Sequence, residues 1–150
     1  VHVNSARLVV GDNVALRFGV SEVPKNANLK LLVWTDREYD ALAEKAKKAG
    51  KSVSDYLVED NCSKALSLSD GHFTFGDIAP EKYADTYYFR LCQTENGNTV
   101  YDYVVAYSVS EYCATKLNDG VDEAIDEFCL ALVDYSAAAR EYLGYTVNKG

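Results

Sequence analysis

The chain of 150 residues contains no methionine, two prolines and one tryptophan, and it lacks any long apolar run. A membrane-spanning helix needs about 18 consecutive apolar residues, so none is expected here. The chain starts at Val1 without an initiator methionine, and it has no basic segment leading into an apolar one, as a secretory signal would show. We therefore interpret the sequence as a piece of a longer or processed protein.

Positive charge is also scarce. Lys and Arg total 15 against 23 Asp and Glu, which gives a formal net charge of −8. Binding to nucleic-acid phosphates or to anionic membranes depends on clustered basic residues, so neither partner is expected. The length matches one domain, residues 1–150, which is long enough to bury a core without a metal or a disulfide.

Four cysteines are present but none forms a Cys-x-x-Cys pair, and His2 and His72 are the only histidines. Structural zinc ligands usually come in such close pairs, so no metal site is expected. Cys113 and Cys129 flank the turn of a predicted helical hairpin. A disulfide between them and a pair of free buried thiols both fit that placement.

The sequence contains none of the common catalytic signatures, such as Gly-x-Ser-x-Gly, His-Glu-x-x-His, Gly-x-Gly-x-x-Gly or a phosphate-binding loop. His72 follows Gly71 at the start of a predicted strand and has no catalytic partner nearby in sequence, so we interpret it as structural. The acidic run at 118–123 departs from calcium-loop spacing, and helix capping explains it. We expect neither an enzyme nor a cofactor.

Alternation of apolar and polar residues, typical of a strand with one buried face, predicts most of the β structure. The turn signal Gly11-Asp12-Asn13 separates the first two runs, and Asn96-Gly97 marks a hairpin between the last two. Trp34 lies in an apolar run that suits a buried central strand, and we expect it in the core. The seven predicted strands cover residues 6–10, 14–20, 29–35, 65–68, 72–75, 86–93 and 99–108.

Two regions have helical composition. Residues 36–51 are rich in Ala, Glu and Lys, and a short helical stripe follows from Ser52 to Leu57. Near the end, Ser110 is expected to cap a short helix, and an Ala-rich helix that stops at Gly144 comes after it.

These patterns together predict an α+β fold. We expect an antiparallel β-sandwich of about seven strands, Ig/fibronectin-like, over residues 5–108. A helical insertion at 36–60 interrupts it, and a C-terminal helical hairpin at 109–144 packs on the sheet.

The strand-helix-helix order at residues 29–57 also resembles ribbon-helix-helix DNA-binding proteins. Those proteins read DNA with polar or basic residues on the strand, whereas this strand carries one lysine, Lys30, in an acidic chain. We interpret the match as a local mimic, and the helical lysines as a solvated face: Lys45, Lys47, Lys48 and Lys51.

Twelve tyrosines are present, and several lie in the last two predicted strands. Residues two apart in a strand share a face, so Tyr101, Tyr103 and Tyr107 are expected to line one face, near Tyr87 of the paired strand. Rows of flat rings stack on sugars in carbohydrate-binding modules, although aromatic residues also simply stabilise sheets. These four tyrosines are the candidate ligand-binding residues.

The second half of the chain carries an ordered set of motifs. Ile78-Ala79-Pro80-Glu81-Lys82-Tyr83-Ala84-Asp85-Thr86 leads into the hairpin, Tyr107-Ser108-Val109-Ser110-Glu111-Tyr112 follows it, and the last helix ends Tyr-Ser-Ala-Ala-Ala-Arg-Glu-Tyr-Leu-Gly-Tyr. This pattern, over residues 78–147, resembles an uncharacterised sandwich module of Firmicute surface and cellulosome-associated proteins. The helical segment at 36–57 departs from the simpler members of that family.

The resemblance implies an extracellular, non-catalytic role beside anchoring, dockerin and Ig-like domains, and it assigns no functional residues. We therefore expect a module of a secreted or cell-surface bacterial protein, for adhesion, scaffolding or protein–protein interaction. Its partner would be a protein or a polysaccharide at the cell surface. The alternative is a carbohydrate-binding module that uses the tyrosine-rich strands.

Overall fold

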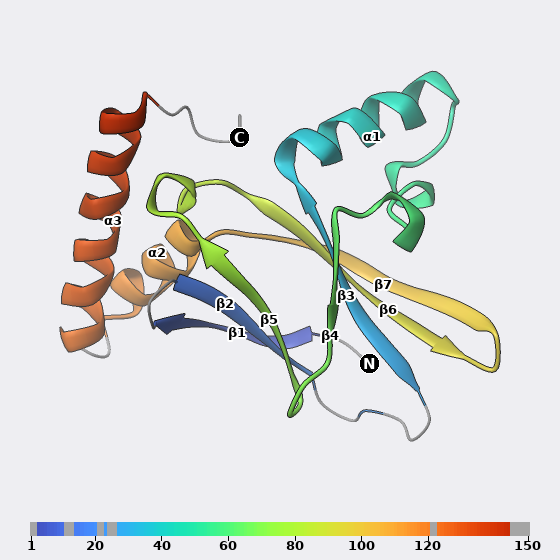
Figure 1. Cartoon of the computed structure of the whole chain (residues 1–150), viewed down its shortest axis with the longest axis horizontal. Helices are drawn as coiled ribbons and strands as arrows, with labels where there is room; N and C mark the ends of the chain where they lie inside the picture. Colours follow the sequence, from blue (N-terminus) through green and yellow to red (C-terminus); the bar gives the residue numbers. More distant parts are fainter. Residues whose placement is uncertain (1–2, 11–13, 21–22, 24–26, 121–122, 145–150) are drawn as a thin grey trace.

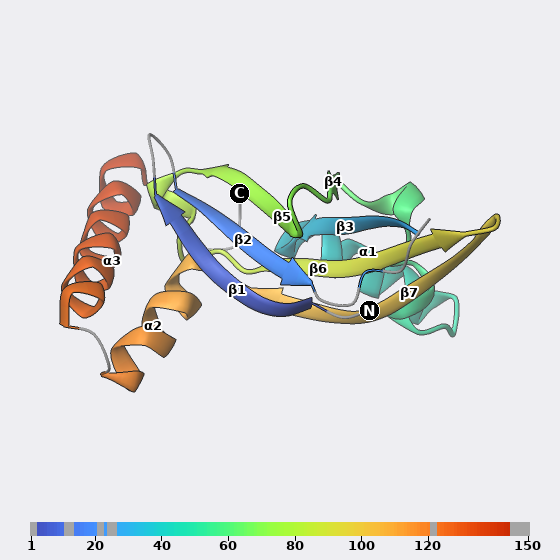
Figure 2. The same cartoon turned by 90° about the horizontal axis from the view of Figure 1, so that it is seen from below.

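The computed structural model describes residues 3–10, 14–20, 23, 27–120 and 123–144. The turn predicted at Gly11-Asp12-Asn13 lies outside these residues, as does Tyr145 of the last motif. The described chain is α+β, with seven antiparallel strands in two sheets and three α-helices, an arrangement compatible with a sandwich (Figures 1 and 2).

The smaller sheet has the strand order β1-β2-β5 and the larger has the order β4-β3-β6-β7. All seven predicted strands are confirmed, with bounds that differ by a few residues. They are β1 (Val3–Val10), β2 (Val14–Val20), β3 (Asn28–Thr35), β4 (Lys64–Ser67), β5 (His72–Ile78), β6 (Tyr87–Glu95) and β7 (Asn98–Tyr107). The Asn-Gly hairpin is also confirmed, because Asn96 and Gly97 both have positive φ (52° and 79°) between β6 and β7.

The main core lies between the two sheets. Phe18 of β2 contacts Phe89 of β6 with ring centroids 4.5 Å apart, and Phe75 of β5 lies 5.7 Å from the same ring. Leu16 and Leu31 are fully buried in this core. Alternate residues of the strands supply these side chains, because successive side chains of a strand point to opposite faces.

The helices flank the sheets. They are α1 (Asp36–Lys48), α2 (Val109–Asp119) and α3 (Glu123–Leu143), with three short 3₁₀ turns: η1 (Val53–Asp55), η2 (Glu59–Asn61) and η3 (Pro80–Lys82). Thr35 and Glu38 form a capping box that starts α1 directly after β3. The second helical stripe predicted from Ser52 folds as η1 rather than as an α-helix, with Ser52 as its cap.

A second core lies on the outer face of the larger sheet, under α1, η1 and η2. Trp34, Leu57, Leu32 and Cys92 are buried there, as expected for Trp34. Trp34 Nε1 donates a hydrogen bond of 2.9 Å to the carbonyl oxygen of Asn61. The larger sheet is therefore covered on both faces.

The C-terminal helices lie at one end of the molecule, where α3 stands outermost in both views (Figures 1 and 2). The expected packing on the sheet holds for α2, which contacts β1, whereas α3 packs mainly on α2 and η3. Both faces of the larger sheet are already occupied. The helix cap also differs from expectation, because the Ser108 side chain, not that of Ser110, accepts from the amide of Glu111 at 2.9 Å.

Candidate functional site

The four candidate tyrosines do not form one row. The pairing of β6 with β7 shifts register between Arg90 and Cys92, which is a β-bulge. An extra residue at the bulge reverses which face the following side chains take, so Tyr101 joins the core under α1 while Tyr107 joins the core between the sheets. Tyr87 also faces the main core, where its ring lies 4.8 Å from that of Phe75.

Tyr101 contacts other parts of the protein through both its ring and its hydroxyl. The guanidinium of Arg90 lies 4.9 Å from the centroid of its ring, and its hydroxyl accepts a bond of 3.5 Å from the amide of Glu59. Arg90 also donates from Nε to the carbonyl oxygen of Asp102 (2.7 Å) and from one terminal nitrogen to that of Leu57 (2.8 Å). These bonds fasten η1 and η2 onto the sheet. Of the four candidates, Tyr103 is the exposed one, with 60% of its surface accessible.

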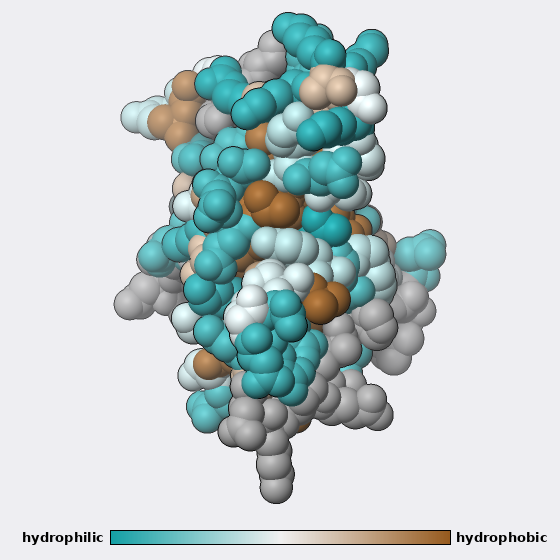
Figure 3. Space-filling model, turned by 90° about the vertical axis from the view of Figure 1, so that its right-hand side faces the viewer, coloured by the Kyte–Doolittle hydropathy of each residue, from teal (hydrophilic) through white to brown (hydrophobic). Residues whose placement is uncertain are grey.

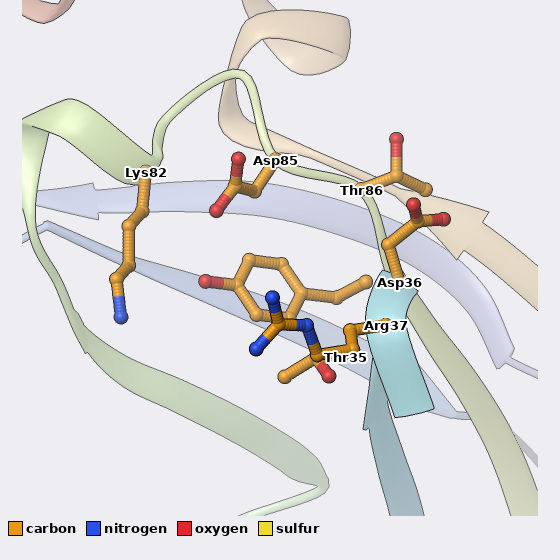
Figure 4. Close-up of a pocket in the computed structure, with 7 residues that line it drawn as sticks. Thr35, Asp36, Arg37, Lys82, Asp85 and Thr86 are labelled. Atoms are coloured by element: carbon orange, nitrogen blue, oxygen red, sulfur yellow. The ribbon is translucent and has the colours of Figure 1, made fainter. Parts of the chain in front are cut away.

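A small hollow lies between the start of α1 and the segment after η3. Figure 4 shows Lys82 and Asp85 on one side of it, facing Thr35, Asp36 and Arg37. Tyr87 also lines it, and burial, together with the nearby carboxylates of Asp85 and Glu81, raises the pKa of Tyr87 to about 12. The hollow offers about 20 Å³ of space for water, enough for a single molecule but not for a sugar ring.

His72 lies at the start of β5. Its Nδ1 lies 2.9 Å from the backbone carbonyl oxygen of Asp70, and Asp70 and His72 line a shallow hollow of about 130 Å³ with Arg17 and Thr74. No group of three or more His, Cys, Asp or Glu side chains able to hold a metal ion occurs among the described residues. Within the part of the chain that the structure describes, the ring of His72 therefore contacts a backbone oxygen rather than a side-chain acid or base.

Cys113 and Cys129 meet between α2 and α3. Both are fully buried free thiols, and burial, with the hydrogen bond and charge interaction from Cys129, raises the pKa of Cys113 to about 12. A protonated thiol is a poor nucleophile, so Cys113 is an inert packing group in this state. The structure brings the two predicted partners together, and the disulfide between them stays a prediction.

The DNA-binding resemblance of residues 29–57 does not extend to the sheet. β3 pairs with β4 along one edge and with β6 along the other. A ribbon-helix-helix strand pairs with a second copy, and β3 has no edge left for that pairing.

The surface that the sequence analysis missed is on α3. Among the described residues, most of the exposed large apolar side chains lie on this helix: Ile125, Phe128, Leu130, Val133, Tyr135, Tyr142 and Leu143. The sequence feature that could have revealed this surface is a repeat of seven residues. In it an acidic residue precedes an aromatic one, at Glu127-Phe128, Asp134-Tyr135 and Glu141-Tyr142. In the described chain, no helix is long and apolar enough to cross a membrane, and that includes α3.

Comparisons with protein-family models, with curated proteins and with solved structures found no match for this chain.

Proposed function

We propose that this chain is a non-catalytic interaction module of an exported bacterial protein, working in adhesion or scaffolding at the cell surface. The observation that carries the proposal is the exposed apolar surface of α3, which includes three aromatic rings. Large exposed apolar patches are uncommon on monomeric domains and mark interaction sites. Aromatic side chains are also enriched in protein–protein interfaces.

The proposal includes an Ig- or fibronectin-like identity for the two sheets. If the strands are named A, B, C, C′, E, F and G in chain order, the sheets read A-B-E and C′-C-F-G. That order places C, F and G together and C′ beside C, as in immunoglobulin-type sandwiches. The helical segment at 36–60 then interrupts the sandwich between strands C and C′, and α2 and α3 extend it.

Cellular location is the first test. Cells that produce the full-length gene product are fractionated and treated with an external protease, and antibodies against this chain follow it. We expect the chain in the medium or the cell wall, where the protease reaches it. A chain found only in the cytosol would contradict the proposal.

Interaction is the second test. A photo-crosslinking amino acid replaces Tyr142 in the producing cells, and a matched one replaces Glu44 on the exposed face of α1. We expect one identified protein to crosslink repeatedly from position 142 and not from position 44. Equal labelling from both positions would argue against a dedicated surface on α3.

A carbohydrate-binding module is the second candidate, and the β6–β7 hairpin favours it. An open hollow of about 400 Å³ lies there, lined by Gln93, Glu95, Asn96, Asn98 and Val100. Amide side chains can hydrogen-bond sugar hydroxyls, and exposed Tyr103 lies on the same hairpin. The end of the molecule seen in Figure 3 is largely hydrophilic, with isolated hydrophobic side chains.

A glycan array and plant-polysaccharide pull-downs test the second candidate. Binding that is lost with Tyr103→Ala and kept with Tyr142→Ala would favour it. No binding to any glycan, or equal binding by both variants, would eliminate it.

A further inference from the structure

Helix α3 repeats a pattern of seven residues along most of its length. Phe128, Tyr135 and Tyr142 lie seven apart, and Ala131 and Ala138 lie between them, three residues after one ring and four before the next. Positions spaced alternately by three and four residues form a continuous seam on a helix. We call these five residues the aromatic stripe.

The stripe faces away from the body of the protein. The buried positions of α3 are Cys129 and Ser136, which occupy one place in the same repeat and pack toward α2 and η3. The rings of the stripe become steadily more exposed along the helix: 40% at Phe128, 61% at Tyr135 and 89% at Tyr142. The two alanines are also exposed, so the stripe alternates large rings with shallow gaps.

An acidic row runs beside the stripe. Glu127, Asp134 and Glu141 each directly precede a ring of the stripe, and all three are exposed. No ion pair within 4.0 Å involves them in the described part of the chain. Arg140 is the basic residue of α3, and its guanidinium donates a 2.7 Å bond to the Ser136 hydroxyl on the buried side. The row therefore presents uncompensated negative charge along one flank of the stripe.

A second copy of this chain fits the stripe poorly. In an antiparallel pair of helices the same flank of each helix meets its counterpart, so the two acidic rows would face each other. In a parallel pair the acidic row would meet the opposite flank, where Leu132 packs against the protein's own core and Ala139 is half-buried. Like charges placed together, or charges placed on apolar surface, both oppose association.

We propose that the aromatic stripe binds an amphipathic helix of a partner protein. Large apolar residues of that helix would fill the gaps over Ala131 and Ala138, and Lys or Arg on its flank would pair with the acidic row. This is helix-to-helix recognition with charges that set the partner and its orientation. The inference rests on the proposed function, in which α3 is the interaction surface.

Synthetic helical peptides of about three heptads test the inference against the full chain. The first peptide has Leu on its seam and Lys on its flanks, the second has Glu in place of Lys, and the third has the composition of the first in shuffled order. We expect the Lys peptide alone to bind, with an affinity that falls as salt is added.

Two variants of the full chain sharpen the test. Combined Glu127→Lys, Asp134→Lys and Glu141→Lys changes should weaken the Lys peptide at least about tenfold and admit the Glu peptide. Combined Tyr135→Ala and Tyr142→Ala changes should weaken the Lys peptide by a similar factor, because rings form the centre of the contact. The matched control places the same charge reversals on the α1 side, at Asp40, Glu44 and Asp55, and should bind like the parent. Circular dichroism verifies that each variant is folded.

Three results would overturn the inference. They are no binding of the Lys peptide, equal binding of the Lys and Glu peptides, or a dimer of the chain in sedimentation that Tyr135→Ala and Tyr142→Ala dissociate. If position 142 still crosslinks an identified partner in cells, the proposed function survives these results. A cytosolic chain that binds the Lys peptide would contradict the proposed function and support the inference.

Discussion

Helices α1 and α3 lie toward opposite ends of the molecule, and they place their apolar side chains differently (Figure 1). α1 turns Tyr39 and Leu42 onto the larger sheet, where the ring of Tyr39 stacks on that of Tyr88 at 3.9 Å. α3 buries the small residues Cys129 and Ser136 and leaves its rings outside. Both helices are amphipathic, so an apolar face by itself does not tell whether a helix serves the core or a partner.

The two ends also differ in how they are tied to the sheets. At the α1 end, Lys30 of β3 forms an ion pair of 3.1 Å with Glu59 of η2, and Arg90 holds η1. At the α3 end, α2 contacts β1, whereas α3 packs mainly on α2 and η3. We expect the α1 end to depend on its aromatic and arginine side chains for stability, and the α3 end to tolerate the loss of its rings.

Trp34→Ala should have the largest effect. It removes a fully buried ring and its hydrogen bond to Asn61, which should cost about 3–5 kcal/mol of the free energy of unfolding. Tyr142→Ala at the other end should change it by no more than about 0.5 kcal/mol, since that ring is exposed. Urea denaturation of both variants measures the difference. Similar losses in the two variants would mean that the stripe is part of the core.

Arg90→Lys should come next. Lysine keeps the charge but loses the planar fork that reaches carbonyls of η1, Leu57 and β7 at once, so we expect a loss of about 1.5–3 kcal/mol. Hydrogen exchange should accelerate over residues 53–61. The matched change Arg140→Lys, which affects one bond to Ser136, should cost less. Unchanged exchange at 53–61 would refute this role for Arg90.

Alkaline pH should destabilise the protein through its buried tyrosines. Burial and then the Asp36 carboxylate, which the Tyr88 hydroxyl contacts at 3.2 Å, raise the pKa of Tyr88 from its ordinary value near 10 to about 12. Burial first raises the pKa of Tyr107 to about 12 as well. Because the folded state holds these protons more tightly, the stability they contribute is complete below pH 10 and is lost as the pH rises toward 12.

The measurement is the urea midpoint as a function of pH. Tyr88→Phe keeps the ring but removes the hydroxyl, so it should flatten the decline between pH 10 and 12. A decline equally steep in that variant would exclude Tyr88 as a source.

Loss of a helix cap should have a smaller effect than Trp34→Ala or Arg90→Lys, and a similar one at α1 and α2. Thr35→Ala at α1 and Ser108→Ala at α2 each remove one side-chain bond to a helix amide, at 3.2 Å and 2.9 Å, and each should cost about 1 kcal/mol. Thermal denaturation compares them. A much larger loss at Thr35 would indicate that docking of α1, rather than its cap, depends on that residue.

Local sequence patterns predicted the seven strands, the hairpin at Asn96-Gly97 and the helical stretch after Thr35 with good accuracy. They failed at the bulge between Arg90 and Cys92, because strict alternation holds only while the pairing register is constant. Tyr101 and Tyr107 therefore lie on opposite faces, and the predicted row of rings does not form. No residue near the bulge carries a local signature that would reveal it.

The chain by itself determined the composition limits and the strand and helix periods, because these depend on neighbours a few residues apart. It also contained the repeat of acidic and aromatic residues in α3. Only the tertiary structure decided which apolar face became core and which stayed exposed. The sheets bury one side of each helix at most, and which elements occupy their faces depends on pairings between residues that are far apart in the chain.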